Sequence, residues 1–230
     1  MTTGLKGVKT ISKLHSDCQS PRQEGFWFLS LKWLLISAIV LISLELISKP
    51  LRYAWADDLA KKGDAYLLEK RYLEAQLQYE KGLAIASQNK RCLTQLELAK
   101  KAEHNILALE NFYLENKIEP KTRLFEKAKA EPADIIQALN TVKELIEIKE
   151  YELAIIPAQK AVAKDPSFRD AWLYLGIANL NTVKFADIRP EIREKYQEEA
   201  KEALGKALSL DDKYQPTLDF IQELEVVSGK

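Results

Sequence analysis

The chain has 230 residues, and its 34 basic and 34 acidic side chains give a formal charge of zero at pH 7. Balanced charge, with only 8 glycines and 8 prolines, excludes the basic excess of nucleic-acid-binding proteins and the bias of low-complexity chains. The balance is an average, because residues 1–50 carry six basic and three acidic side chains and the remainder is acidic. We therefore expect no nucleic-acid partner.

A polar N-terminal tail at 1–25 precedes an apolar segment at 26–48. This segment has about the twenty residues that a helix needs to cross a hydrocarbon core, and its charges, Lys32 and Glu45, lie near its ends. Aromatic residues flank it on both sides, as they do at membrane interfaces: Phe26, Trp27, Phe28, Trp33, Tyr53 and Trp55. A buried core helix would need apolar partners that the rest of the chain does not offer. We therefore predict a single transmembrane helix over 26–48.

The segment could instead belong to a cleaved signal peptide, because Ala54-Trp55-Ala56 satisfies the small-x-small cleavage rule. The long leader, the nearby Arg52 and the bulky Trp55 oppose cleavage. Five basic residues before the core of the span, including Lys32, favour a cytoplasmic N-terminus and an extracytoplasmic C-terminal domain. We interpret residues 49–55, with Pro50, as a short interfacial joint, and we expect the next helix to begin at Ala56, where Asp57 and Asp58 would favour a helix start.

Helical periodicity with a repeat begins at residue 56. Over 56–89, Leu59, Gly63 and Tyr66 align on one helix and Tyr72, Ala75, Tyr79 and Gly82 on a second. This pattern resembles the tetratricopeptide repeat, in which small residues let two antiparallel helices approach closely. Gly82 and Ser87 depart from the residues that the family prefers.

A clearer match lies later, where Trp172, Leu175 and Gly176 follow the family's W-x-x-L-G order, with Asn179 in place of the usual Tyr. Before it, a second helix and its terminating proline are indicated by Tyr151, Ala154, Ala158, Ala161 and Pro166, and a third repeat continues with Ala200, Leu204 and Ala207. The resemblance implies an all-α, short tetratricopeptide-like solenoid of about three repeats, closed by a capping helix that begins near Pro216. An unrelated helical bundle is the alternative.

Three segments depart from the family pattern. Residues 90–117 predict one long amphipathic helix, so 56–117 would hold the first repeat and this extra helix. Residues 118–133, with Pro120 and Pro132, predict a linker with at most one short helix before the remaining repeats at 134–230. An insertion at 181–199 predicts a longer helix from Pro190 after a protruding turn. It is either a tolerated loop extension or a partner contact.

Residues that could carry chemistry are few. His15 and His104 have no catalytic companion nearby, and Cys18 and Cys92 lie on opposite sides of the apolar segment. The acidic pairs at 57–58, 198–199 and 211–212 have structural explanations, and we expect Cys92 to behave as a small hydrophobe. We therefore assign no catalytic, cofactor-binding or metal-binding residues and expect no enzyme, with a helical enzyme of unfamiliar site as the alternative.

In the tetratricopeptide family, the first helices of the repeats line a groove that binds peptides. The resemblance implies a groove formed by Asp64, Leu67, Leu68, Lys143, Ile146, Leu173, Ile177 and Leu180, with Ala60 and Leu139 at matching positions. Ala60 and Asp64 do not fit the subset that grips a C-terminal carboxylate. The groove residues could equally pack against the chain's own extra helix at 90–117.

These features predict a membrane-anchored adaptor that binds one or more protein partners and needs no cofactor. Confinement to a membrane raises the effective concentration of a weakly bound partner. The layout is similar to bacterial proteins in which one N-terminal helix anchors such repeats beside secretion, envelope-assembly or cell-division machinery. A cleaved or cytosol-facing soluble repeat domain is the alternative.

Overall fold

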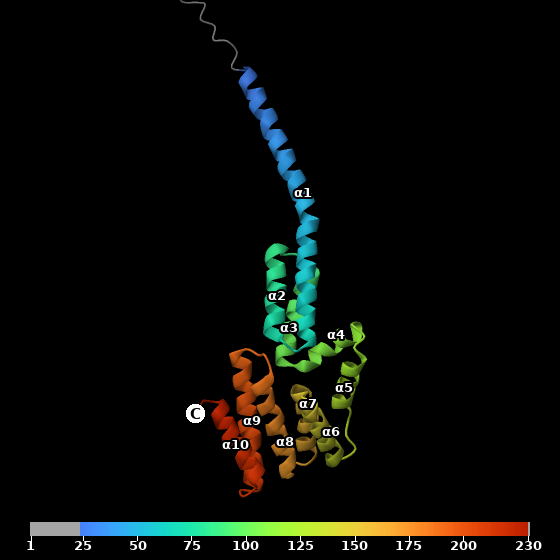
Figure 1. Cartoon of the computed structure of the whole chain (residues 1–230), viewed down its shortest axis with the longest axis vertical. Helices are drawn as coiled ribbons and strands as arrows, with labels where there is room; N and C mark the ends of the chain where they lie inside the picture. Colours follow the sequence, from blue (N-terminus) through green and yellow to red (C-terminus); the bar gives the residue numbers. More distant parts are fainter. Residues whose placement is uncertain (1–23, 230) are drawn as a thin grey trace, which may run out of the picture. The chain divides into compact units, whose positions relative to one another are not determined.

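A computed structural model describes the backbone of residues 24–229 and the side chains of residues 32–229. The described residues form ten α-helices and one short 3₁₀ helix, with no β-strand (Figure 1). The predicted all-α class is therefore confirmed for this part of the chain. The chain divides into two compact units, residues 1–51 and residues 52–230. His15, Cys18 and nearly all of the N-terminal tail lie outside the described residues.

The first unit contains the N-terminal part of helix α1 (Glu24–Leu68). Its apolar side chains are exposed on all faces, including Trp33 at 68%, Leu41 at 66% and Ile47 at 72%. Among the described residues, α1 alone is long and apolar enough to cross a membrane, with a window of mean hydropathy 2.0.

The predicted joint at 49–55 is helical, which corrects two expectations. Helix α1 continues through Pro50, so no helix begins at Ala56 and the two aspartates after it lie within the helix. A proline removes one backbone hydrogen bond, but helix on both sides of it can offset that loss. Asp57 does not mark a helix start; its carboxylate accepts a hydrogen bond from Asn89 Nδ2 at 2.8 Å.

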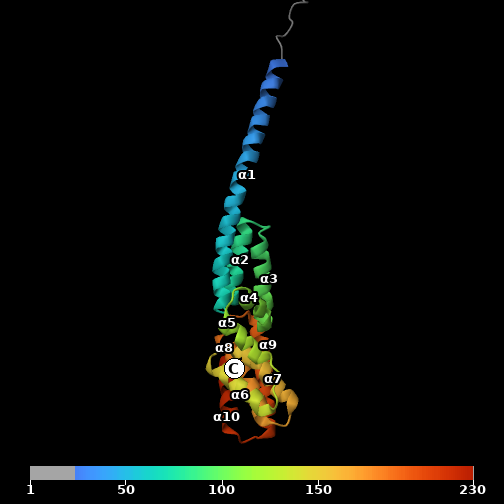
Figure 2. The same ribbon diagram turned by 90° about the vertical axis from the view of Figure 1, so that its right-hand side faces the viewer.

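The second unit begins with a three-helix group made of the last turns of α1, helix α2 (Tyr72–Ile85) and helix α3 (Lys90–His104), which run side by side (Figures 1 and 2). Small residues set the helix spacing: a Cβ added at Gly63 would lie 2.4 Å from the Tyr79 ring. Tyr79 donates its hydroxyl to Asp64 at 2.8 Å. Cys92 is buried, as predicted, and contacts Gly82.

The prediction of one long helix over 90–117 is wrong, because the helix ends at His104. Asn105 is extended, and its side chain accepts a hydrogen bond from the Leu107 N–H at 3.0 Å to start a 3₁₀ helix, η1 (Ile106–Leu109). Helices α4 (Glu110–Glu115) and α5 (Glu119–Lys129) follow. Much of the expected linker at 118–133 is thus helical, and Phe125 in α5 is buried. The side-chain cap at Asn105 competes with continuation of the helix.

The second unit ends with a stack of five helices: α6 (Ile135–Glu147), α7 (Tyr151–Lys164), α8 (Arg169–Phe185), α9 (Pro190–Leu210) and α10 (Gln215–Val227). Each packs against the next (Figure 1). A Cβ added at Gly176 would lie 2.6 Å from Leu204 Cγ, so glycine allows α8 and α9 to approach closely. Helix α10 covers one end of the stack, where Leu224 is buried with Leu204.

The insertion at 181–199 does not form a protruding turn. Helix α8 extends to Phe185 and α9 begins at Pro190, as expected, but the connecting turn 186–189 packs into the protein. Ile188 is 2% exposed, and the Asp187 backbone pairs with that of Arg71. Ile188 is apolar and gains from burial, so it holds the turn inward.

Candidate functional site

Three turns between paired helices meet at one place in the second unit. They connect α1 with α2, α6 with α7, and α8 with α9. Between them lies a cavity of about 310 Å³, lined by residues 69–71, 149, 151, 152, 182 and 185–187. We call it the junction cavity. Cavities between packed blocks of a protein are common ligand sites, so we take it as the candidate site.

Two lysines in equivalent turns shape the cavity. Lys70 and Lys149 have positive φ angles of 59° and 62°, the left-handed conformation that commonly ends a helix. The next residue donates its backbone N–H back into the helix, with Arg71 to Tyr66 at 2.9 Å and Glu150 to Leu145 at 2.8 Å. The two turns are therefore alike and tight.

The turns are joined by ion pairs. Glu150, whose side chain is 7% exposed, pairs with Lys70 and with Lys121 of α5. Burial by itself would raise the pKa of the Glu150 carboxyl, but the two lysines outweigh burial and lower that pKa below its ordinary value. Glu150 is therefore an ionised anchor between α1, α5 and α7.

Glu152 differs from Glu150 although it lies only two residues away. Its side chain is 6% exposed and lines the junction cavity. Its carboxylate accepts a hydrogen bond from the Tyr72 hydroxyl at 3.1 Å, and its nearest cation, Lys70 Nζ, is 3.7 Å away. Burial raises the pKa of the Glu152 carboxyl, because Lys70 and Tyr72 compensate it incompletely. A buried carboxyl with a raised pKa in a cavity is a recognised mark of functional sites.

Three tyrosines surround this pair of glutamates. Burial raises the pKa of Tyr72, Tyr113 and Tyr196, and the charge of Glu152 raises each one further. The Tyr113 hydroxyl is buried and has no hydrogen-bond partner among the described residues. Near Glu152, the Tyr113 hydroxyl is therefore a buried polar group whose hydrogen-bonding capacity the described residues leave unsatisfied.

The third turn contributes a carboxyl group that caps a helix. Helix α2 has no side-chain cap of its own at Arg71. Asp187 supplies one, since its Oδ2 accepts a hydrogen bond from the Leu73 N–H at 3.2 Å. Burial and the neighbouring Glu74 carboxylate raise the pKa of Asp187. The interactions of Glu74 with Asp187 and with Arg71 lower the pKa of Glu74.

An aromatic pair forms one wall of the cavity. The rings of Tyr151 and Phe185 stack with centroids 5.4 Å apart. Phe185 is 63% exposed, and Lys184 Nζ lies 5.2 Å from its ring centroid. The cavity therefore offers an accessible aromatic face beside a buried carboxyl group.

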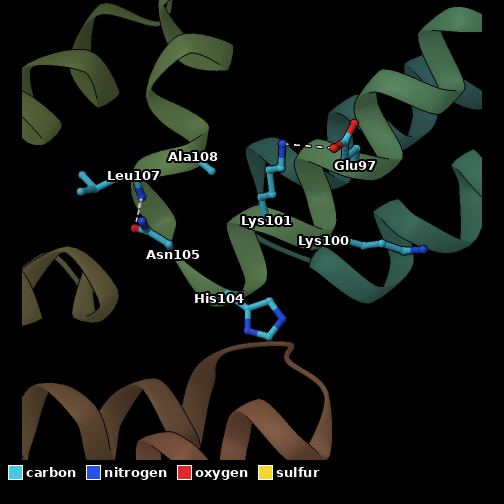
Figure 3. Close-up of a pocket in the computed structure, with 7 residues that line it drawn as sticks. All are labelled: Glu97, Lys100, Lys101, His104, Asn105, Leu107 and Ala108. Carbon is cyan, nitrogen blue, oxygen red and sulfur yellow. Dashed lines mark hydrogen bonds and ion pairs between the residues drawn. The ribbon is translucent and has the colours of Figure 1, made fainter.

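A second depression lies over α3 and η1 and includes His104 (Figure 3). It is shallow, and three of its polar side chains are occupied locally: Lys101 pairs with Glu97 at 3.2 Å, and Asn105 caps η1. His104 is exposed, and its Nε2 lies 3.2 Å from Arg189 Nη2. This depression has no buried polar group that would orient a ligand.

The residues of the predicted groove do not share one surface. Leu67, Leu173, Ile177 and Leu180 are buried in the core, and Ile146 is partly buried against it. The matching positions Ala60 and Leu139 are buried too. The chain itself covers these side chains, but Leu173, Ile177 and Leu180 pack in a cluster with residues of α9 and α10 and not with residues 90–117, which the self-packing alternative expected.

The other three predicted groove residues are accessible but separate. Leu68 is 39% exposed near the end of α1, and Lys143 on α6 lies over the Tyr174 ring at 5.2 Å. Asp64 is partly buried and pairs with Arg91 at 2.5 Å. The structure therefore does not gather the eight predicted residues into one open groove.

The residues of the junction cavity were missed because the sequence places them in turns. One signal was available: Lys70-Arg71-Tyr72 and Lys149-Glu150-Tyr151 repeat a Lys-x-Tyr pattern at equivalent turns. The sequence does not indicate that these turns face each other, since 80 residues separate Lys70 from Glu150.

The cavity presents a buried carboxyl group, basic side chains and an exposed aromatic ring. Within residues 24–229, no three His, Cys, Asp or Glu side chains are grouped to hold a metal ion. The chain matches no protein-family model and no curated protein sequence.

Proposed function

We propose that this chain is a membrane-tethered adaptor, in which a short tetratricopeptide-like array binds a partner protein. The observation that carries the proposal is the close packing of two helix pairs, α1 with α2 and α8 with α9, at a glycine. Gly63 meets Tyr79 and Gly176 meets Leu204 at distances that leave no room for a Cβ. These are the small positions of the tetratricopeptide pattern, and arrays of such pairs commonly serve as binding surfaces.

The tether is the apolar part of α1. Its apolar side chains are exposed on every face, which is unfavourable in water and suited to lipid. The possible cleavage site supports retention rather than removal, because Ala56 is buried and its carbonyl accepts a hydrogen bond from Cys92 Sγ. We place the N-terminus in the cytoplasm and residues 52–230 outside it, as the basic residues before the span favour.

The array is split rather than continuous. The break at Asn105 and helices α4 and α5 separate the first helix pair from the later ones, and the junction cavity lies where the two parts meet. A split array of this kind offers a partner a site between its parts. Tethering would let a modest affinity suffice, because the partner is held at a high effective concentration.

Site-specific photo-crosslinking of the full chain in its native cells tests the adaptor function. Photoreactive residues are placed at exposed apolar positions on separate helices, Leu77, Ile136 and Phe185, and at the charged exposed position Glu97 as a control. We expect at least one apolar position to crosslink to the same discrete protein in the membrane fraction, with no such product at Glu97. Absence of a discrete product from all three apolar positions would contradict the adaptor function.

A further inference from the structure

Acidic and basic side chains are balanced in the lining of the junction cavity. Three acidic side chains line it, Glu69, Glu152 and Asp187, against three basic ones, Lys70, Arg71 and Lys149. The basic side chains are, however, shared unequally. Lys70 and Lys121 both form ion pairs with Glu150. Arg71 forms ion pairs with Glu69 and Glu74.

Glu152 is the carboxyl group that this distribution leaves without a close cation. Its one cationic neighbour, Lys70, lies at 3.7 Å and is engaged more closely by Glu150. Its hydrogen-bond donor, the Tyr72 hydroxyl, carries no positive charge. A buried carboxylate with incomplete pairing is costly, so a cation that entered the cavity would relieve that cost.

The wall beside Glu152 suits a long side chain with a positive end. Phe185 is 63% exposed and stacks on Tyr151, so its outer face is open to solvent and to the cavity. An aromatic face attracts cations, and the methylene chain of a lysine or arginine can lie on such a ring. Lys184 Nζ lies 5.2 Å from the Phe185 ring centroid and is held in an ion pair with Glu223. At about 310 Å³, the cavity has the size of the smallest ligand pockets.

We propose that the junction cavity binds a lysine or arginine side chain of a partner protein, with its methylenes on Phe185 and its charged end beside Glu152. This proposal rests on the adaptor function and names the feature of the partner that is recognised. Lys149 at the rim opposes the incoming charge. It is exposed and forms no ion pair with the described residues, so it can turn into solvent.

The test uses the full chain in detergent micelles and simple probes of the side chain. The probes are N-acetyl-lysine methylamide, its norleucine analogue, its glutamate analogue and free spermidine, and affinities are measured by ligand-observed saturation-transfer NMR titration. We expect the lysine compound to bind at least tenfold more tightly than the norleucine and glutamate compounds. Equal binding of the lysine and norleucine compounds, or tighter binding of the glutamate compound, would overturn the proposal.

Variants assign the binding to the cavity. Glu152→Gln keeps an acceptor for Tyr72 and should weaken the binding of the lysine compound at least tenfold, whereas Lys149→Gln should strengthen this binding severalfold. Glu97→Gln, on an exposed face of α3, is the matched control and should change the affinity by less than twofold. An unchanged affinity of the Glu152→Gln variant for the lysine compound would overturn the proposal.

Two further arms keep the proposal testable. If Glu152→Gln does not fold, Phe185→Leu serves instead, because Phe185 is exposed; it should weaken the lysine compound severalfold and leave the norleucine compound unchanged. If spermidine binds tenfold more tightly than the lysine compound, the ligand is a free polyamine and the protein-partner proposal is overturned. Crosslinking at Leu77 or Ile136 without any lysine preference would reject this inference alone and leave the adaptor function standing.

Discussion

The carboxylate of Glu103 accepts both the backbone N–H of Arg189, at 2.6 Å, and the Nε–H of the same arginine, at 2.9 Å. The side chain of Glu103 is fully buried, and Gln76 adds a third hydrogen bond at 3.0 Å. These contacts join α2 and α3 to the turn before α9. Through Arg189, the insertion at 181–199 thus connects the α8–α9 pair to helices α2 and α3.

Removing the arginine side chain should weaken the second unit. We expect Arg189→Ala to lower the free energy of unfolding by about 1–3 kcal/mol, because Glu103 stays buried with one charged partner fewer. Urea unfolding in detergent, followed by circular dichroism, measures the loss. Arg123→Ala is the control: its pair with Glu119 is exposed, so it should change stability by less than about 0.5 kcal/mol. Equal losses in the two variants would show that the buried contact contributes nothing.

Two glycines should respond in opposite ways to a methyl group. We expect Gly176→Ala to destabilise the protein by about 1–3 kcal/mol, since the new Cβ would lie 2.6 Å from Leu204 Cγ. Gly205→Ala on the partner helix α9 meets nothing within 4 Å and should stabilise it by about 0.5–1 kcal/mol, because alanine restricts the unfolded chain. Melting temperatures of both variants decide the matter; the same sign for both would refute close packing at Gly176.

The two glutamates of the junction should give opposite pH dependences. The lowered pKa of Glu150 means that its ion pairs stabilise the fold above pH 4.5, its ordinary value, and that this contribution disappears as pH falls through the folded-state pKa. Glu150→Gln should therefore cost about 1–3 kcal/mol at pH 7 and progressively less below pH 4.5.

For Glu152 the sign is reversed. Its raised pKa means that the folded protein holds the proton more tightly, so stability falls as pH rises from 4.5 through the folded-state pKa. We expect Glu152→Gln to be at least as stable as the wild type at pH 7 and to lose that advantage towards pH 4. The groups facing it are Lys70, Glu150, Tyr72, Tyr113 and Tyr196. A Glu152→Gln variant that is less stable at pH 7 than at pH 4, relative to wild type, would contradict this assignment.

The tether can be tested by one charge. Val40→Arg should reduce membrane insertion by about 2.5–3.5 kcal/mol, the cost of arginine near the centre of a span, whereas Val40→Leu should insert normally. Carbonate extraction of membranes measures the retained fraction. Protease treatment of intact and opened membranes, with a C-terminal tag, then tests orientation: the tag should be digested only once the extracytoplasmic side is accessible. Recovery of wild-type protein in the soluble fraction would refute the tether.

How much the sequence predicts depends on the range of the interactions involved. Helical content, the start of α9 at Pro190 and the burial of Cys92 follow from local periodicity and from residue type. The break at Asn105 did not, because the amphipathic pattern continues across it and only the local side-chain cap interrupts the helix. The continuation of α1 through Pro50 was missed for the opposite reason, since a proline signal was outweighed by helix on both sides.

The sequence by itself determined the helical character of the described residues and one apolar helix, because composition and periodicity are properties of neighbouring residues. Only the tertiary structure decided that the turn at 186–189 packs inward and that Lys70 meets Glu150 across 80 residues. It also decided that Glu152 is a buried carboxyl group in a cavity while Glu150 is a paired anchor. Burial and pairing depend on which distant segments pack together, and a local pattern does not record that.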